Sequence, residues 1–151
     1  SSGIGCLKGV VDGYISVNKD RVGLNDGNKI ATDPDAQMAL AEAISAVDEC
    51  QTIMFRNFDA MVEAAKNGSQ LPIEQRIKMR FDAAAVSRKC TDAINHMFNA
   101  CGAQGIFRDH PLNRAWLDIN AGRQHVANNP FKFGRNLGGT MMGQENSDFF
   151  L

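Results

Sequence analysis

The stretch from residue 34 to residue 66 limits the possible folds more than any other feature. It holds no glycine, and its only proline stands at its first position. Apolar residues recur in it at intervals of three and four, which indicates an amphipathic helix. About 33 residues at about 1.5 Å each make a helix of about 50 Å, a length typical of a helix bundle.

Breaks around this stretch divide the rest of the chain into further helices. Asp33-Pro34-Asp35 is a typical helix start, and Asn67-Gly68 is a typical end. The chain has only 4 prolines in 151 residues. We therefore expect an all-α fold, an up-down four-helix bundle. The expected helices cover residues 4–20, 34–66, 72–101 and 111–128.

Residues 131–151 are rich in glycine and asparagine, and we expect them to form an irregular tail that is docked on the bundle. Phe131, Phe133 and Met141 either line an aromatic pocket or belong to the core. The residue before a proline avoids the helical region, so Asn129-Pro130 is expected to stop the fourth helix.

The expected third helix carries two apolar stripes. One contains Ile77, Phe81, Ile94 and Phe98, and the other contains Met79, Val86, Cys90 and Met97. A helix with two apolar faces is normally buried on both. We expect the second stripe to require another domain or subunit.

Composition excludes several classes of function. Lys and Arg number 16 against 17 Asp and Glu, so nucleic acid and membrane surfaces are not expected partners. There is no run of 18 apolar residues and no secretory leader. The four cysteines form no C-x-x-C pair, which favours reduced thiols in a cytoplasmic protein. Without a Glu-x-x-His pattern, no metal is expected.

Several segments in order resemble the C-terminal helical domain of the acyl-CoA dehydrogenase superfamily. They are Asn18-Lys19-Asp20-Arg21, the run from Asp33 to Glu42, the run from Asn99 to Gly105, and the run from Pro111 to Asp118. The resemblance covers the chain up to about Pro130, and its most specific part lies between Gly102 and His125. Residues 1–130 are then the C-terminal domain of a larger flavoenzyme. Its N-terminal helical and middle β domains lie outside this chain, and the missing initiator Met fits that expectation.

Within that superfamily the chain looks like the flavin-dependent monooxygenase branch. Many acyl-CoA dehydrogenases carry their catalytic base as a glutamate in a Tyr-Glu-Gly stretch, which falls here on His125-Val126-Ala127. Val126 cannot remove a proton. The monooxygenase branch tends to have a histidine at this place, so the resemblance makes His125 the candidate catalytic residue. Histidine exchanges a proton near neutral pH and is suited to assist oxygen transfer.

The resemblance also assigns flavin contacts to Arg21, Asn99, Gly102 and Ala103. The superfamily holds FAD with an Arg-x-x-Phe-Gly loop and a Gln before Gly-Gly-x-Gly. Here Leu24-Asn25 replaces Phe-Gly, Asn99 replaces the Gln, and Ala103 replaces the second Gly. A weakened adenosine site is consistent with reduced flavin, FMN or FAD, that arrives as a diffusible substrate.

The resemblance therefore implies the oxygenase component of a two-component monooxygenase. A separate flavin reductase supplies reduced flavin, and a C4a-hydroperoxide formed with O2 hydroxylates a small aromatic substrate. The bundle is expected to form a homotetramer. Two alternatives stay open, an acyl-CoA dehydrogenase whose base lies elsewhere and a non-catalytic helical oligomerisation module.

Overall fold

The computed structural model describes residues 2–23 and 27–151, and within them it is helical. The α-helices are α1 (Ser2–Asn18), α2 (Pro34–Lys66), α3 (Ile73–Ala100), α4 (Pro111–Arg123) and α5 (Pro130–Met141). Short 3-10 helices lie at η1 (Ile30–Thr32), η2 (Gly102–Ile106) and η3 (Val126–Asn128). Leu24 and Asn25, which stand in place of the superfamily's Phe-Gly, lie outside the described residues. None of the described helices is long and apolar enough to cross a membrane.

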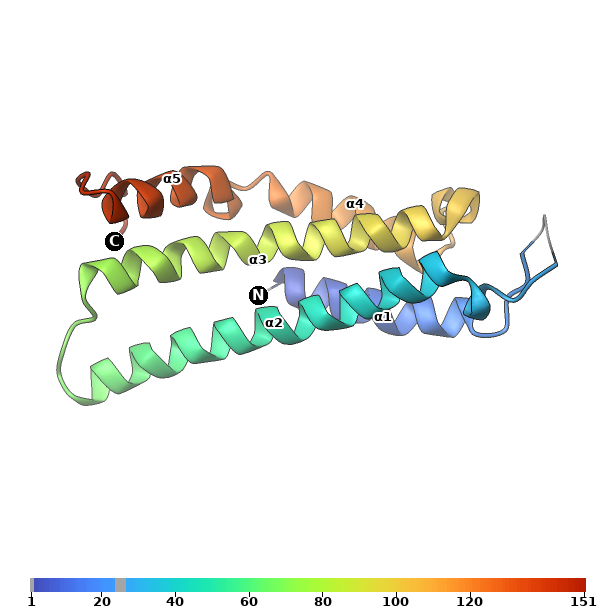
Figure 1. The fold of residues 1–151 in the computed structure, drawn as a ribbon, viewed down its shortest axis with the longest axis horizontal. Coiled ribbons are helices and arrows are strands. Elements are labelled where there is room, and N and C mark those ends of the chain that lie inside the picture. The colour runs from blue at the N-terminus through green and yellow to red at the C-terminus, as the bar shows by residue number, and fades with distance from the viewer. Residues whose placement is uncertain (1, 24–26) are drawn as a thin grey trace.

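The helices run up and down along one axis (Figure 1). The two longest, α2 and α3, form an antiparallel hairpin. Helix α1 lies beside the half of α2 that is nearest to its start, and α4 and α5 follow one another along α3. The all-α, up-down bundle expected from the sequence is thus confirmed. The place of its fourth helix is taken by two consecutive helices, α4 and α5.

Local signals explain where α2 begins. The Asp33 carboxylate accepts a hydrogen bond from the Ala36 amide at 2.9 Å, and Pro34 occupies the first turn. Pro lacks an N–H that this turn would leave unpaired, and Asp35 complements the positive end of the helix. The first and fourth helices are shorter than expected, because α1 ends at Asn18 and α4 ends at Arg123.

The irregular tail predicted from residue 131 is wrong for its first part, since residues 130–141 form α5. The Asn129 side-chain oxygen accepts hydrogen bonds from the amides of Phe131 at 3.1 Å and Lys132 at 3.2 Å. Pro130 supplies the first helical position. The dipeptide that stops one helix therefore starts the next. The expectation of docking holds, because Phe133 is 2% exposed.

The expectation that α3 needs a partner outside the chain is also wrong. Helix α3 packs against α1 and α2 on one side and against α4 and α5 on the other. Val86, Cys90 and Met97 of its second stripe are buried, as are Ile77 and Ile94 of its first. Cys90 of the second stripe lies against Gly3 of α1, and Phe81 of the first stripe lies against Gly134 of α5, the helix that the sequence prediction lacked.

Helix α2 buries small residues and leaves large ones outside. Its buried positions are Ala36, Ala39, Ala43 and Cys50. Its half-exposed large apolar side chains are Met38 at 58%, Ile44 at 50%, Phe55 at 55%, Phe58 at 51%, Met61 at 40% and Val62 at 51%. We call these six residues the outer face of α2; Phe58 and Met61 also line a groove that α2 forms with α3 and the start of α1.

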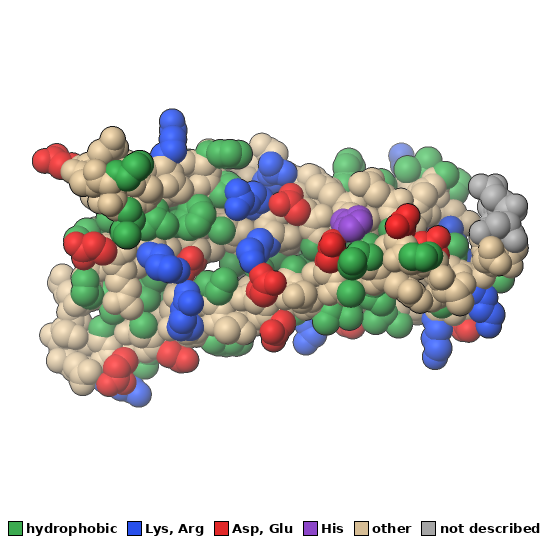
Figure 2. All heavy atoms as spheres, viewed as in Figure 1, with side chains coloured by type: hydrophobic (Ala, Val, Ile, Leu, Met, Phe, Trp, Pro, Cys, Tyr) green, Lys and Arg blue, Asp and Glu red, His purple; other side chains and the backbone are tan. Residues whose placement is uncertain are grey.

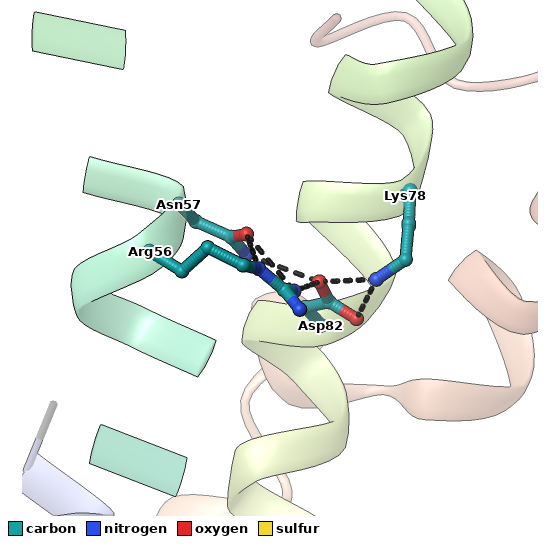
Figure 3. Close-up of polar contacts among 4 residues, drawn as sticks. All are labelled: Arg56, Asn57, Lys78 and Asp82. Carbon is teal, nitrogen blue, oxygen red and sulfur yellow. Dashed lines mark hydrogen bonds and ion pairs between the residues drawn. The ribbon is translucent and has the colours of Figure 1, made fainter. Parts of the chain in front are cut away.

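Charged side chains of both signs follow the seam between α2 and α3 (Figure 2). At the end of the seam where the hairpin opens, Arg56, Asn57 and Lys78 converge on the Asp82 carboxylate (Figure 3). The Arg56–Asp82 and Lys78–Asp82 distances are 3.2 and 2.8 Å. Further along, Lys89 pairs with Glu49 and the His96 ring nitrogen lies 2.6 Å from Glu42. Such exposed pairs contribute little stability each, but they set how α2 lies against α3.

Candidate functional site

Arg21 lies at the end of the bundle where α1 and α3 finish. Its guanidinium donates to the Asn18 side-chain oxygen at 3.1 Å and to the Cys101 carbonyl oxygen at 3.5 Å. Asn18 is buried and donates to the Tyr14 carbonyl oxygen at 3.0 Å. These bonds tie Arg21 to the last turn of α3, directly before Gly102 and Ala103.

The turn after α3 presents open backbone at this end. Gly102 has φ +60°, and no atom lies within 4 Å of the place a Cβ would take. This left-handed position ends the helix and favours glycine. Asn99, Gly102 and Ala103 are exposed. The structure therefore brings the four predicted flavin contacts to one end of the bundle.

Buried polar atoms without partners gather at the same end. The Tyr14 hydroxyl, the Arg21 Nε and the His110 Nε2 are buried and have no hydrogen-bond partner among the described residues. Gly13 allows α1 to approach the start of α4 closely, since a Cβ at this position would lie 3.2 Å from the Pro111 Cβ. Buried polar groups are normally paired. Unpaired N–H donors here fit an oxygen-rich group, as the predicted flavin contacts require.

The His110 ring is held as an acceptor on one side. Its Nδ1 accepts a hydrogen bond from the Leu112 amide at 3.3 Å, which places the proton of the neutral ring on Nε2. Burial, and then the charge of Arg21, lower the pKa of His110. Burial raises the pKa of Tyr14 to about 12. Electrostatic interactions with Cys101 and Asp33 raise this pKa further, and the interaction with Arg21 lowers it. Both groups are thus held neutral beside the Arg21 charge.

His125 lies at the other end of α4. Thirteen helical residues separate His110 from the end of α4, a span of about 20 Å. Within one chain, His125 and Arg21 are therefore not parts of one compact site. The His125 ring is exposed, and its Nδ1 accepts a hydrogen bond from the Ala127 amide at 3.2 Å. The neutral ring then carries its proton on the outward Nε2.

A cleft of about 330 Å³ opens next to His125, among α1, α3, α4 and η3. Ala127 and Asn128, the second and third residues after His125, line its edge. Arg80 and Ser87 of α3 and Asp118 of α4 supply polar side chains to its walls. Asp118 is held by Arg114, with Nε to oxygen distances of 3.1 and 2.9 Å.

The described part of the chain gathers no group of three or more His, Cys, Asp or Glu side chains that could hold a metal ion. Its four cysteines are free thiols, and three of them are buried. Of the three aromatic-pocket candidates, Phe133 belongs to the core, while Phe131 and Met141 are 69% and 75% exposed.

Comparison with known proteins identifies the family. The family described as "Acyl-CoA dehydrogenase, C-terminal domain" matches residues 1–130. The chain belongs to this family. The fold supports the assignment, because the crystal structure of 3-HSA hydroxylase from Rhodococcus sp. RHA1 superposes with a TM-score of 0.87 at 28% identity over 97% of this chain.

Named relatives point to one branch of the family. The oxygenase subunit HsaA of a flavin-dependent monooxygenase from Mycobacterium tuberculosis is 32% identical over 69% of this chain and 26% of its own length. The HsaA protein of Rhodococcus jostii is 30% identical over 84% of this chain and 34% of its own. The oxygenase component of an FADH(2)-dependent resorcinol hydroxylase from Rhizobium sp. is 29% identical over 96% of this chain and 37% of its own length. The chain thus spans between a quarter and two fifths of these proteins.

Sequence reasoning missed Tyr14, His110 and Arg80. His110 stands directly before Pro111 and caps α4 through Nδ1, so its place in the sequence already has a structural explanation. A tyrosine on an apolar stripe carries no local sign that its hydroxyl lacks a partner. Arg80 reaches the cleft only because α1, α4 and η3 surround it, which depends on the tertiary structure.

Proposed function

We propose that the full protein is the oxygenase component of a two-component flavin-dependent monooxygenase. The observation that carries this proposal is His125, an exposed imidazole two residues before the edge of a cleft, followed by Val126 where many dehydrogenases have their glutamate. A valine side chain cannot act as a base, whereas an imidazole donates or accepts a proton near neutral pH. The names of the HsaA relatives support the same branch.

His125 is the proposed catalytic residue. Since its Nδ1 accepts from the Ala127 amide, its Nε2–H points outward as a donor, and the ring orientation is fixed. Such a donor is suited to hold the oxygen to be transferred.

Reduced flavin, FMN or FAD, supplies the oxygen chemistry through a C4a-hydroperoxide, and the substrate is a small aromatic compound. We assign flavin contacts to Arg21, Asn99, Gly102 and Ala103. The unpaired Arg21 Nε and the open backbone at Gly102 support this assignment. Because His125 lies far from Arg21 along α4, one chain supplies two separate parts of the proposed machinery.

The proposed partners are three further copies of this chain and a separate flavin reductase. The outer face of α2 supports the homotetramer, since six half-exposed large apolar side chains on one helix mark an interaction surface. Relatives are named as oxygenase subunits or oxygenase components, which supports a separate flavin reductase as a partner. The length of those relatives supports N-terminal helical and middle β domains upstream. Four free thiols support a cytoplasmic setting.

The test mixes the full-length protein with reduced FMN or FAD and then with oxygen in a stopped-flow spectrometer. A transient hydroperoxide absorbance is expected in the wild type. His125→Asn is expected to shorten its lifetime or to slow hydroxylation by about 10²- to 10⁴-fold, the usual contribution of a general acid or base. His96→Asn, on α3 beside Glu42, is the matched control.

Three results would contradict the proposal. His125→Asn with unchanged formation and hydroxylation rates would remove the role of His125. Tight FAD retention with oxidation of acyl-CoA thioesters would favour a dehydrogenase. A full-length protein that binds no flavin would favour a helical oligomerisation module.

A further inference from the structure

Helices α2 and α3 pack against each other in a regular antiparallel register. Charged pairs bridge the two helices at every seventh residue, because each step forward along α2 is matched by an equal step back along α3. The pairs are Glu42–His96, Glu49–Lys89 and Arg56–Asp82. A repeat of seven is the spacing of a coiled-coil seam, in which residues of one helix face those of the other in layers. The register therefore tells which inward residues of α2 and α3 meet.

Two thiols, Cys50 of α2 and Cys90 of α3, form one of these layers. Each stands directly after a member of the Glu49–Lys89 pair and faces inward, where it is 0% exposed. The Cys90 thiol donates a hydrogen bond to the Cys50 sulfur. Two sulfur atoms that meet across facing helices are close to the arrangement that a disulfide requires.

The adjacent layers keep the same register. Ala43 and Met97, each seven residues from its helix's thiol, are both 0% exposed. On the other side, Met54 and Val86 each lie four residues from the thiols, and they line one groove together. The buried positions of α2 other than Cys50 are alanines, so that α3 can approach this helix closely. The contact between the two thiols thus follows from the packing of the whole hairpin.

The surroundings give the two thiols different roles. The hydrogen bond from Cys90 lowers the pKa of Cys50, burial opposes this effect, and the charge of Lys89 adds to it. The same hydrogen bond and burial raise the pKa of Cys90. The thiolate is the nucleophilic form of cysteine. Cys50 is therefore the sulfur that reacts first with an oxidant, and Cys90 is placed to react with the product.

We propose that Cys50 and Cys90 are a redox modification site, at which hydrogen peroxide converts the two thiols into a disulfide between α2 and α3. The Cys50 thiolate attacks one peroxide oxygen, the O–O bond breaks, and the departing hydroxide takes up the proton that Cys50 released. Cys90 then attacks the sulfenic acid on Cys50, the S–O bond breaks, and the hydroxyl leaves as water with the proton of Cys90. Two thiols are oxidised, and one peroxide is reduced to two waters.

The disulfide locks the hairpin. It closes a loop of about 40 residues that contains the turn between α2 and α3, which restricts the unfolded chain and stabilises the folded one. Because both sulfurs are buried, their oxidation waits for small openings of the bundle and is slower than that of an exposed thiol. Thiol reductants reverse the reaction.

The test treats the full-length protein with hydrogen peroxide in the absence of flavin, blocks the remaining thiols and maps the peptides by mass spectrometry. The wild type is expected to give the Cys50 and Cys90 peptides joined, at a mass lower by two hydrogen atoms. Dithiothreitol is expected to separate them. The oxidised protein is expected to melt a few degrees above the reduced protein.

Single variants separate the two roles. Cys90→Ala leaves Cys50 without its partner and is expected to accumulate the sulfenic acid, which dimedone traps as an adduct. Cys50→Ala is expected to leave Cys90 reduced. Cys6→Ala is the matched control, because Cys6 is a half-buried thiol of α1 outside this layer. It should leave the cross-link and the rise in Tm unchanged, and circular dichroism checks that each variant is folded.

The proposal is overturned if Cys50 and Cys90 stay reduced after treatment that oxidises N-acetylcysteine completely in a parallel sample. A disulfide between Cys6 and Cys90 overturns it as well, as does a sulfinic acid at Cys50 in the wild type, since either would mean that Cys90 does not react with oxidised Cys50. Because no flavin is present, these outcomes are independent of the proposed function.

Discussion

Helices α2 and α3 form one hairpin but face opposite surroundings. Helix α3 packs against α1, α2, α4 and α5 of its own chain, and Thr91, Ile94 and Met97 are 0% exposed. Helix α2 buries alanines and presents Phe55 and Phe58 outward at 55% and 51%. The difference shows that apolar periodicity alone does not say which helix needs a partner. The helix with two apolar stripes buries most of both within the chain, whereas the helix with one keeps several large apolar side chains exposed.

Truncation in the centre of α3 is expected to have the largest effect. Ile94→Ala removes methylene groups that are 0% exposed, which should lower the free energy of unfolding by about 3 kcal/mol. Ile44→Ala, at the 50% exposed position on α2, should lower it by less than about 1 kcal/mol. Urea unfolding followed by circular dichroism measures both. If both variants lose the same free energy of unfolding, the contrast between α2 and α3 is contradicted.

Polar substitution on the outer face of α2 is expected to act on assembly. Phe55→Ser with Phe58→Ser should raise the dissociation constant of the oligomer by about tenfold or more per phenylalanine, because buried aromatic side chains dominate interface energies. Light scattering across a micromolar dilution series measures the change. Lys66→Ser at the end of α2 is the control. An unchanged mass at every concentration would mean that this face has another role.

Loss of the α5 cap is expected to weaken the cover over α3. Asn129→Ala removes the acceptor for the Phe131 and Lys132 amides, which should lower the free energy of unfolding by about 1 kcal/mol. Asn129→Asp keeps an acceptor and should be nearly neutral. Hydrogen exchange of the α5 amides gives a local measurement. If alanine leaves their protection unchanged, the cap does not hold α5.

The smallest expected effect is a pH dependence from His110, where α1, α3 and α4 meet. Its pKa is lowered by burial and by Arg21, so the folded state binds its proton less readily than the unfolded chain. The stability from the neutral ring is therefore present above the unfolded pKa, about 6.5, and is lost as pH falls through the folded pKa. His110→Asn keeps a cap and should reduce this acid loss of Tm while matching the wild type at pH 8. An unchanged acid slope would refute the assignment.

Helices and caps were largely predictable because their causes are local. The α2 start follows from Asp33 and Pro34, and its apolar periodicity from 3.6 residues per turn. The same kind of signal at Asn129-Pro130 was interpreted only as a stop, and so α5 was missed. The flavin-site candidates came from resemblance, and the structure gathers Arg21, Asn99, Gly102 and Ala103 at one end without testing their role.

The amino-acid sequence by itself determined the helical class and the up-down order of the chain, since propensity and capping are properties of neighbouring residues. The candidate residues came from its resemblance to a known family. Only the tertiary structure decided which apolar faces are covered. It also separated His125 from Arg21 along α4 and left Tyr14 and His110 with buried atoms that have no hydrogen-bond partner among the described residues. These features depend on contacts between residues far apart in the chain, and no local pattern specifies them.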